Sequence, residues 1–124
     1  MADHNIFTME EHGGVAVVNL RGKLDRDSIT MIDDTIEELK SRKLHRVVFD
    51  FENVEYIFSA ALGKLILFLK SSRNEGGDIH VTGLNRSIAA IFEVTRLREI
   101  LPVHSTVAEA VAAFAVPTEP KADI

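Results

Sequence analysis

The sequence predicts an α/β domain: a mixed sheet of about four to five strands with helices packed mainly on one side. Short β-branched runs alternate with longer segments whose apolar residues recur every three or four positions, as expected for strands separated by helices. Strands joined through helices run parallel, whereas a glycine-centred hairpin near the N-terminus adds an antiparallel strand at the edge. A chain of 124 residues suits one such domain.

The first third of the chain predicts a hairpin followed by a helix. Short strands flank His12-Gly13-Gly14, where a glycine pair adopts the positive φ of a tight turn at little cost. Residues 21–25 are predicted to form a loop, and residues 27–42 a helix that Asp27 or Ser28 caps. The helix follows from one apolar stripe, made of Ile29, Ile32, Ile36 and Leu39.

The middle of the chain predicts the centre of the sheet and the main core helix. Residues 47–51 form a compact β-branched and aromatic run, typical of a strand covered on both faces. A connection over 52–58 leads to a mostly buried helix that begins at Ser59 and ends before Gly76-Gly77. Residues 79–82 form the next strand.

The last third predicts two more helices and one weak strand. Asn85 opens a third helix, and residues 101–103 contain a proline, which restricts them to a short edge strand. A capping box, Thr106 to Glu109, begins the last helix. The domain is therefore predicted over residues 5–114, with residues 115–124 as a flexible tail.

Composition excludes several classes of function. The net charge of −5 and pI near 5.5 have the wrong sign for gripping nucleic acid. No cysteine is present, so disulfides and thiolate metal sites are impossible. No apolar run approaches the roughly twenty residues that span a bilayer, and the N-terminus lacks a basic start followed by an apolar run. We therefore expect a cytoplasmic protein without nucleic-acid binding or direct membrane insertion.

Motifs for catalysis and cofactors are missing from the sequence. The five histidines are scattered, and none pairs with another at helical spacing, so no metal site is predicted. The carboxylates at 33–34 and 37–38 fall on the polar side of the first helix, opposite its isoleucines. No phosphate-binding glycine loop and no G-x-S-x-G nucleophile motif occurs. The prediction is a protein without catalytic residues or cofactors.

The carboxyl ends of the parallel strands are where open α/β sheets place functional residues. Three segments are expected to converge there: residues 22–25, 50–59 and 83–85. Ser59 stands at the predicted first turn of the core helix, where free N–H groups and the positive dipole favour an anion such as a phosphate. Serine is also a favoured N-cap, and capping alone would explain its presence there.

The chain resembles the STAS domain of bacterial anti-sigma-factor antagonists over residues 5–114. The resemblance rests on Gly22-Lys23-Leu24-Asp25, on the strand 47–51 with Asn53-Val54, on the segment 56–63, and on the glycine turn before Ile79. It implies a sheet with helices mainly on one side and no active site. It also implies binding to an anti-sigma factor, which frees the sigma factor that the anti-sigma factor holds.

The regulated members of this family are switched off by their partner. That partner is a serine protein kinase related to histidine kinases, which phosphorylates the serine of a D-S-[ST]-G-L motif, and a phosphatase reverses the reaction. Ser59 falls on that serine, and Asp25 on a loop aspartate that shapes the docking surface. The chain departs from the motif at Phe58, Ala60 and Ala61, which replace the acid, the second hydroxyl and the glycine.

The predicted partner-binding surface combines three segments. Exposed apolar side chains at 58 and 60–62 are expected at its centre, with Asp25 and Asp27 as an acidic rim that speeds encounter with a basic partner. Its residues are Lys23, Asp25, Asp27, Ser28, Phe58, Ser59, Ala60, Ala61, Leu62, Gly63, Leu84, Asn85 and Ser87.

Two other functions fit the same residues. The first is a STAS-like subunit of a signalling scaffold or of a lipid-transport complex, with Ser59 as a cap and no covalent control. The second is a small enzyme or nucleotide-binding protein that uses Asp25, Asp50 and Ser59 in the crevice.

Overall fold

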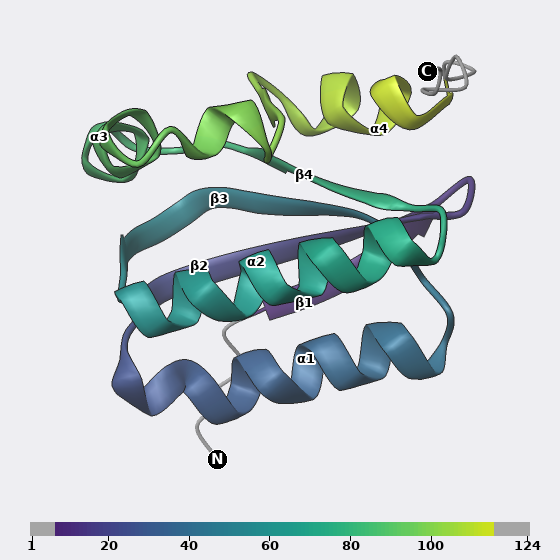
Figure 1. Ribbon diagram of the computed structural model, residues 1–124, viewed down its shortest axis with the longest axis horizontal. Helices are drawn as coiled ribbons and strands as arrows, with labels where there is room; N and C mark the ends of the chain where they lie inside the picture. The colour runs from purple at the N-terminus through teal and green to yellow at the C-terminus, as the bar shows by residue number, and fades with distance from the viewer. Residues whose placement is uncertain (1–6, 116–124) are drawn as a thin grey trace.

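A computed structural model describes residues 7–115, which fold into a five-stranded sheet flanked by helices (Figure 1). The strands lie in the order β1-β2-β3-β4-β5; β1 pairs antiparallel with β2, and all other neighbours are parallel. The strands are β1 (Phe7–His12), β2 (Val15–Leu24), β3 (Arg46–Ile57), β4 (Asp78–Thr82) and β5 (Val103–His104). The helices are α1 (Ile29–Ser41), α2 (Ser59–Asn74), α3 (Arg86–Val94) and α4 (Val107–Ala115), with short 3-10 turns η1 (Arg26–Ser28) and η2 (Leu97–Glu99).

Helices pack on both faces of the sheet, and one face has the larger hydrophobic core. Helices α1 and α2 lie side by side against one face, and α4 lies across the sheet from them (Figure 1). The main core forms under α1 and α2 and also takes in Ile88 and Phe92 of α3. A smaller cluster on the opposite face joins α4 to β2 and β3, through Val15, Val17, Val48 and Ala110. The predicted fold class is confirmed, with α4 as the helix on the second face.

Two strands extend beyond their predicted ends. The predicted loop 21–25 belongs to β2 as far as Leu24, and the predicted connection 52–58 belongs to β3 as far as Ile57. β4 pairs with β3 only up to Asp50, so the second half of β3 pairs with β2 alone. That half carries exposed polar residues, which made it look like a loop. Gly22, at φ +82°, accommodates one of the two register shifts between β2 and β3.

The predicted caps are correct at α3 and α4 and wrong at α1. The Asn85 side chain accepts a hydrogen bond from Ile88 N (2.8 Å), and Thr106 Oγ1 accepts one from Glu109 N (3.1 Å). The expected capping by Asp27 or Ser28 is wrong, because neither side chain caps α1. Instead, Asp25 Oδ1 accepts from Asp27 N (3.0 Å) and caps the preceding turn η1.

The predicted domain limits extend slightly beyond the described residues. Residues 5 and 6 and nearly all of the predicted tail 115–124 lie outside them; only Ala115 is described, as the last residue of α4. Within residues 7–115, no helix combines the length and the apolar character needed to cross a bilayer.

Candidate functional site

The carboxyl ends of β2, β3 and β4 meet at one end of the sheet, where η1, α2 and α3 begin (left in Figure 1). Two hydrogen bonds tie these segments together. Phe58 N donates to Leu24 O (2.8 Å), and Asn85 Nδ2 donates to Val54 O (3.0 Å). The convergence of the three predicted segments is therefore confirmed, because parallel strands bring their following loops to one edge.

Ser59 is the first residue of α2, and it is exposed. The N-cap position belongs to Phe58, whose backbone is extended (φ −77°, ψ 146°). No hydrogen bond to the Ser59 hydroxyl occurs within residues 7–115, and the helix start has no side-chain cap. The interpretation of Ser59 as a helix cap is therefore wrong. Its hydroxyl faces solvent beside the free N–H groups of the first helical turn.

In the turn after β2, the predicted site residue Ser28 is buried and forms its hydrogen bond within the turn. Ser28 is only 6% exposed, and its hydroxyl donates to Lys23 O (3.0 Å). Asp25 is half-buried, and its Oδ1 accepts from Asp27 N and lies 3.4 Å from the Ser28 hydroxyl. Lys23 and Asp27 remain exposed, as does Arg26 between them. The expected acidic rim is therefore a rim of mixed charge.

The first turn of α2 exposes fewer apolar residues than predicted. Ala61 and Leu62 are 0% and 8% exposed and belong to the main core, so the prediction that they are exposed is wrong. The Cβ of Ala61 therefore packs in the main core. Phe58 is half-buried against this core, with the Arg26 guanidinium 5.7 Å from its ring centroid. Ala60 is exposed beside Ser59.

The segment after β4 contains one residue that holds the neighbouring loop in place and others that are exposed to solvent or half-buried. The Asn85 side chain caps α3 and also donates to the carbonyls of Val54 and Glu55, so it positions the loop and has little left for a partner. Leu84 is half-buried against the main core, and Ser87 is exposed in the first turn of α3.

Two exposed apolar residues near this end of the sheet were not predicted. Leu67 is 65% exposed on α2, and Tyr56 is 49% exposed near the end of β3. Arg26, within the predicted segment 23–28, covers the Phe58 ring. A helical count from Ser59 would have found Leu67, because residues four apart share a face: Ser59, Gly63 and Leu67 form one outward stripe.

The two aspartates at this end of the sheet that were considered for chemistry are both engaged in local hydrogen bonds. Asp50 is buried, and its Oδ1 accepts from Glu52 N (3.0 Å), while Asp25 is engaged in its own turn. No base contacts the Ser59 hydroxyl within the described chain, so it lacks the partner that activates a nucleophile. Residues 7–115 also contain no group of three or more side chains arranged to hold a metal ion.

Comparison with known proteins decides the family. The model of the STAS domain family matches residues 7–110, nearly all of the described chain. The chain belongs to the STAS domain family. The resemblance inferred from the Gly22–Asp25 segment, the central strand and the start of the core helix is thereby confirmed.

Several proteins similar to this chain are named anti-sigma factor antagonists. The chain is 27% identical over 97 residues to the anti-sigma F factor antagonist of Paenibacillus polymyxa, covering 77% of this chain and 83% of that protein. An anti-sigma factor antagonist from Mycobacterium paratuberculosis has the same fold (TM-score 0.78, 23% identity, 86% and 91% coverage). So does the Bacillus cell fate determinant SpoIIAA in its phosphorylated form (TM-score 0.69, 17% identity, 87% and 98% coverage).

Proposed function

We propose that this STAS domain is a cytoplasmic anti-sigma factor antagonist whose partner is an anti-sigma factor of the serine-kinase type. The kinase phosphorylates Ser59 and so switches the antagonist off, and a phosphatase restores it. The exposed, unpartnered hydroxyl of Ser59 at the start of α2 carries this proposal. The names of the relatives support the general role, and a phosphorylated form of SpoIIAA has been solved.

The proposed docking surface follows the outward stripe of α2 and the loops beside it. Leu67 and the exposed edge of Phe58 supply apolar area, and Gly63 leaves the helix backbone bare between them. The mixed charges at the rim orient the partner as it approaches, and they contribute less to the affinity of the complex. We define the docking surface as Lys23, Arg26, Asp27, Tyr56, Phe58, Ser59, Ala60, Gly63, Leu67, Leu84 and Ser87.

The mechanism that this surface supports is competitive capture. An anti-sigma factor that docks on the antagonist no longer holds its sigma factor, so transcription by that sigma factor resumes. Because the antagonist needs only a stable complementary surface, a rigid helix start tied to β2 and β3 suffices. The hydrogen bond from Phe58 N to Leu24 O supplies that rigidity.

Phosphorylation of Ser59 is tested by incubating the protein with ATP and a lysate of its own organism. Intact-mass spectrometry should show one added phosphate, which Ser59→Ala abolishes and Ser87→Ala retains. Ser87 is the matched control because it is also an exposed serine in the first turn of a helix. Both variants should fold normally, since replacing an exposed side chain without partners changes stability by no more than about 0.5 kcal/mol.

Two outcomes would contradict this proposal in different ways. An unmodified protein, in a lysate that phosphorylates a standard antagonist, would rule out the covalent switch. Copurification with a transporter ATPase or a scaffold, instead of a kinase-like anti-sigma factor, would favour the alternative of a STAS subunit in a larger assembly.

Gly63→Ala should raise stability and lower partner affinity. A Cβ built at Gly63 meets no atom within 4 Å, and alanine favours a helix over glycine by about 1 kcal/mol. The added methyl group would nevertheless stand on the outward stripe between Ser59 and Leu67, where we expect about a tenfold loss of affinity for a closely packed partner. The melting temperature should therefore rise in thermal unfolding, while the affinity measured by titration calorimetry falls. An unchanged affinity would show that the partner binds elsewhere on the protein.

A further inference from the structure

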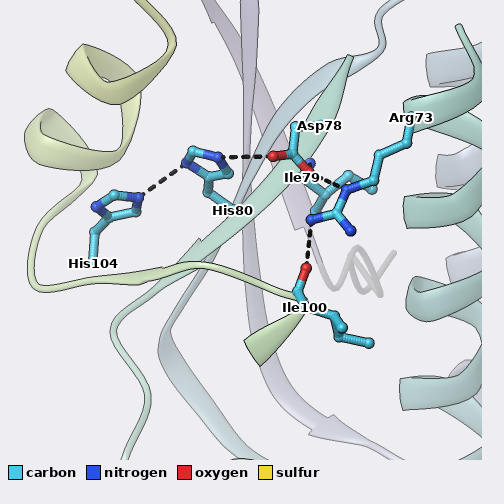
Figure 2. A network of polar contacts seen from close by, with 6 residues as sticks. All are labelled: Arg73, Asp78, Ile79, His80, Ile100 and His104. Carbon is cyan, nitrogen blue, oxygen red and sulfur yellow. Dashed lines mark hydrogen bonds and ion pairs between the residues drawn. The ribbon is translucent and has the colours of Figure 1, made fainter. Parts of the chain in front are cut away.

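Two histidines far apart in sequence meet on the α4 side of the sheet. Nδ1 of His80 in β4 lies 3.0 Å from Nε2 of His104 in β5 (Figure 2). The centroids of the two rings are 4.9 Å apart, and the ring planes are inclined by 26°. His80 is only 8% exposed, and the Phe114 ring of α4 stacks on it at 4.2 Å. The pair therefore sits where β4, β5 and α4 join.

A chain of polar contacts leads from this pair, by way of Asp78 at the start of β4, to Arg73 of α2 (Figure 2). Asp78 Oδ2 lies 3.4 Å from His80 Nε2, and Asp78 Oδ1 accepts from Arg73 Nε of α2 (2.9 Å). Arg73 also donates to the carbonyl of Ile100. These contacts, with a backbone hydrogen bond from Ile79, hold the pKa of Asp78 below its usual value despite partial burial. Asp78 therefore places a carboxylate beside Nε2 of His80.

The hydrogen bond between the two rings can persist with one extra proton on the pair but not with two. When both rings are neutral, one N–H donates across the 3.0 Å contact to the other ring's lone pair. If His80 alone is charged, its Nδ1–H donates to His104, and Asp78 and the Phe114 ring face the positive charge. If both are charged, each ring nitrogen in the contact carries hydrogen, so the hydrogen bond is lost and two cations face each other.

We propose that this histidine pair is an acid-sensitive latch, and that its second proton releases β5 and α4 from the sheet. Apart from the histidine pair, this segment is held by the two-residue strand β5 and by α4, which contributes buried Ala110 and the partly buried Val107, Val111 and Phe114 to the smaller cluster. Release would uncover the apolar side chains of Val15, Val17 and Val48. The proposed docking surface lies on other elements and is left intact.

Acidification acts in the direction of release. Burial and the charge of His80 lower the pKa of His104, while Glu109 in the first turn of α4 opposes the shift. A group with a lowered folded-state pKa binds protons more readily when unfolded or detached. The latched form is therefore fully stable above the ordinary histidine pKa of 6.5, and this stability is lost as the pH falls through the lower folded-state value.

Hydrogen exchange followed by mass spectrometry tests the latch directly. From about pH 7.5 to about pH 5, protection of the α4 amides, corrected for intrinsic rates, should fall about tenfold, while protection of α1 stays constant. His104→Gln should remove the pH dependence, because its amide can donate to His80 Nδ1 without titrating. His12→Gln is the matched control, since His12 is an exposed histidine paired with Glu10; it should keep the wild-type behaviour.

A second readout separates the latch from a general acid effect. In an NMR titration, the α4 amide shifts should follow the protonation of the His104 imidazole. Unchanged α4 protection in the wild type would overturn the proposal. An equal loss of protection in His104→Gln would also overturn it, since that variant has no second proton to take up.

Discussion

Once phosphorylated on Ser59, the protein should bind its anti-sigma factor about 100-fold more weakly than the unmodified protein. A phosphate adds a charge of about −1.5 to −2 at neutral pH, in the stripe that the partner must cover. Removing water from such a charge without a matching cation costs about 3 kcal/mol, which corresponds to the 100-fold loss. Titration calorimetry with the purified phosphorylated and unmodified forms measures the difference.

The loss of binding should occur without unfolding. The phosphate would sit at the N-terminus of α2, where the helix dipole and the free N–H groups favour an anion. The phosphorylated form should therefore unfold at the same temperature as the unmodified form, or slightly higher.

Ser87→Glu, which places a charge at the start of α3, should weaken binding less than Ser59→Glu. Equal affinities of the phosphorylated and unmodified forms would show that Ser59 lies outside the interface.

The sequence predicted those parts of the fold that depend on local patterns. The stripe from Ile29 to Leu39 identified α1, and the caps of α3 and α4 lie at Asn85 and Thr106, as expected. These signals work because helix periodicity and capping involve residues within one or two turns. The end of β3 could not be predicted, because its second half has a neighbour on one side only and carries polar residues.

The candidate site was only partly predictable for a related reason. Helix α2 is apolar nearly all round from Leu65 to Leu69, so no polar face indicates its rotation, and only a count from Ser59 does so. Tertiary packing turns Ala61 and Leu62 inward and Leu67 outward. The contact between His80 and His104 depends on β4 pairing with β5, which no local pattern indicates.

Gly77→Ala is expected to destabilise the protein by about 3 kcal/mol, although Gly77 does not have the positive φ of its neighbour Gly76. A Cβ built on Gly77 would lie 1.9 Å from His45 O and 2.7 Å from His45 Cβ. The same carbonyl accepts the hydrogen bond from Asp78 N (2.9 Å) that begins the pairing of β4 with β3. Relieving the contact therefore requires moving the backbone at the start of a strand that lies inside the sheet.

The matched control for this substitution is Gly63→Ala. Both glycines lie outside the positive-φ region, but a Cβ at Gly63 meets open space. The same chemical change should thus lower the melting temperature by about 12 °C at Gly77 and raise it by about 4 °C at Gly63. Differential scanning calorimetry measures both. Similar melting temperatures for the two variants would mean that the turn between α2 and β4 can move away from His45, and that this backbone contact does not set the position of β4.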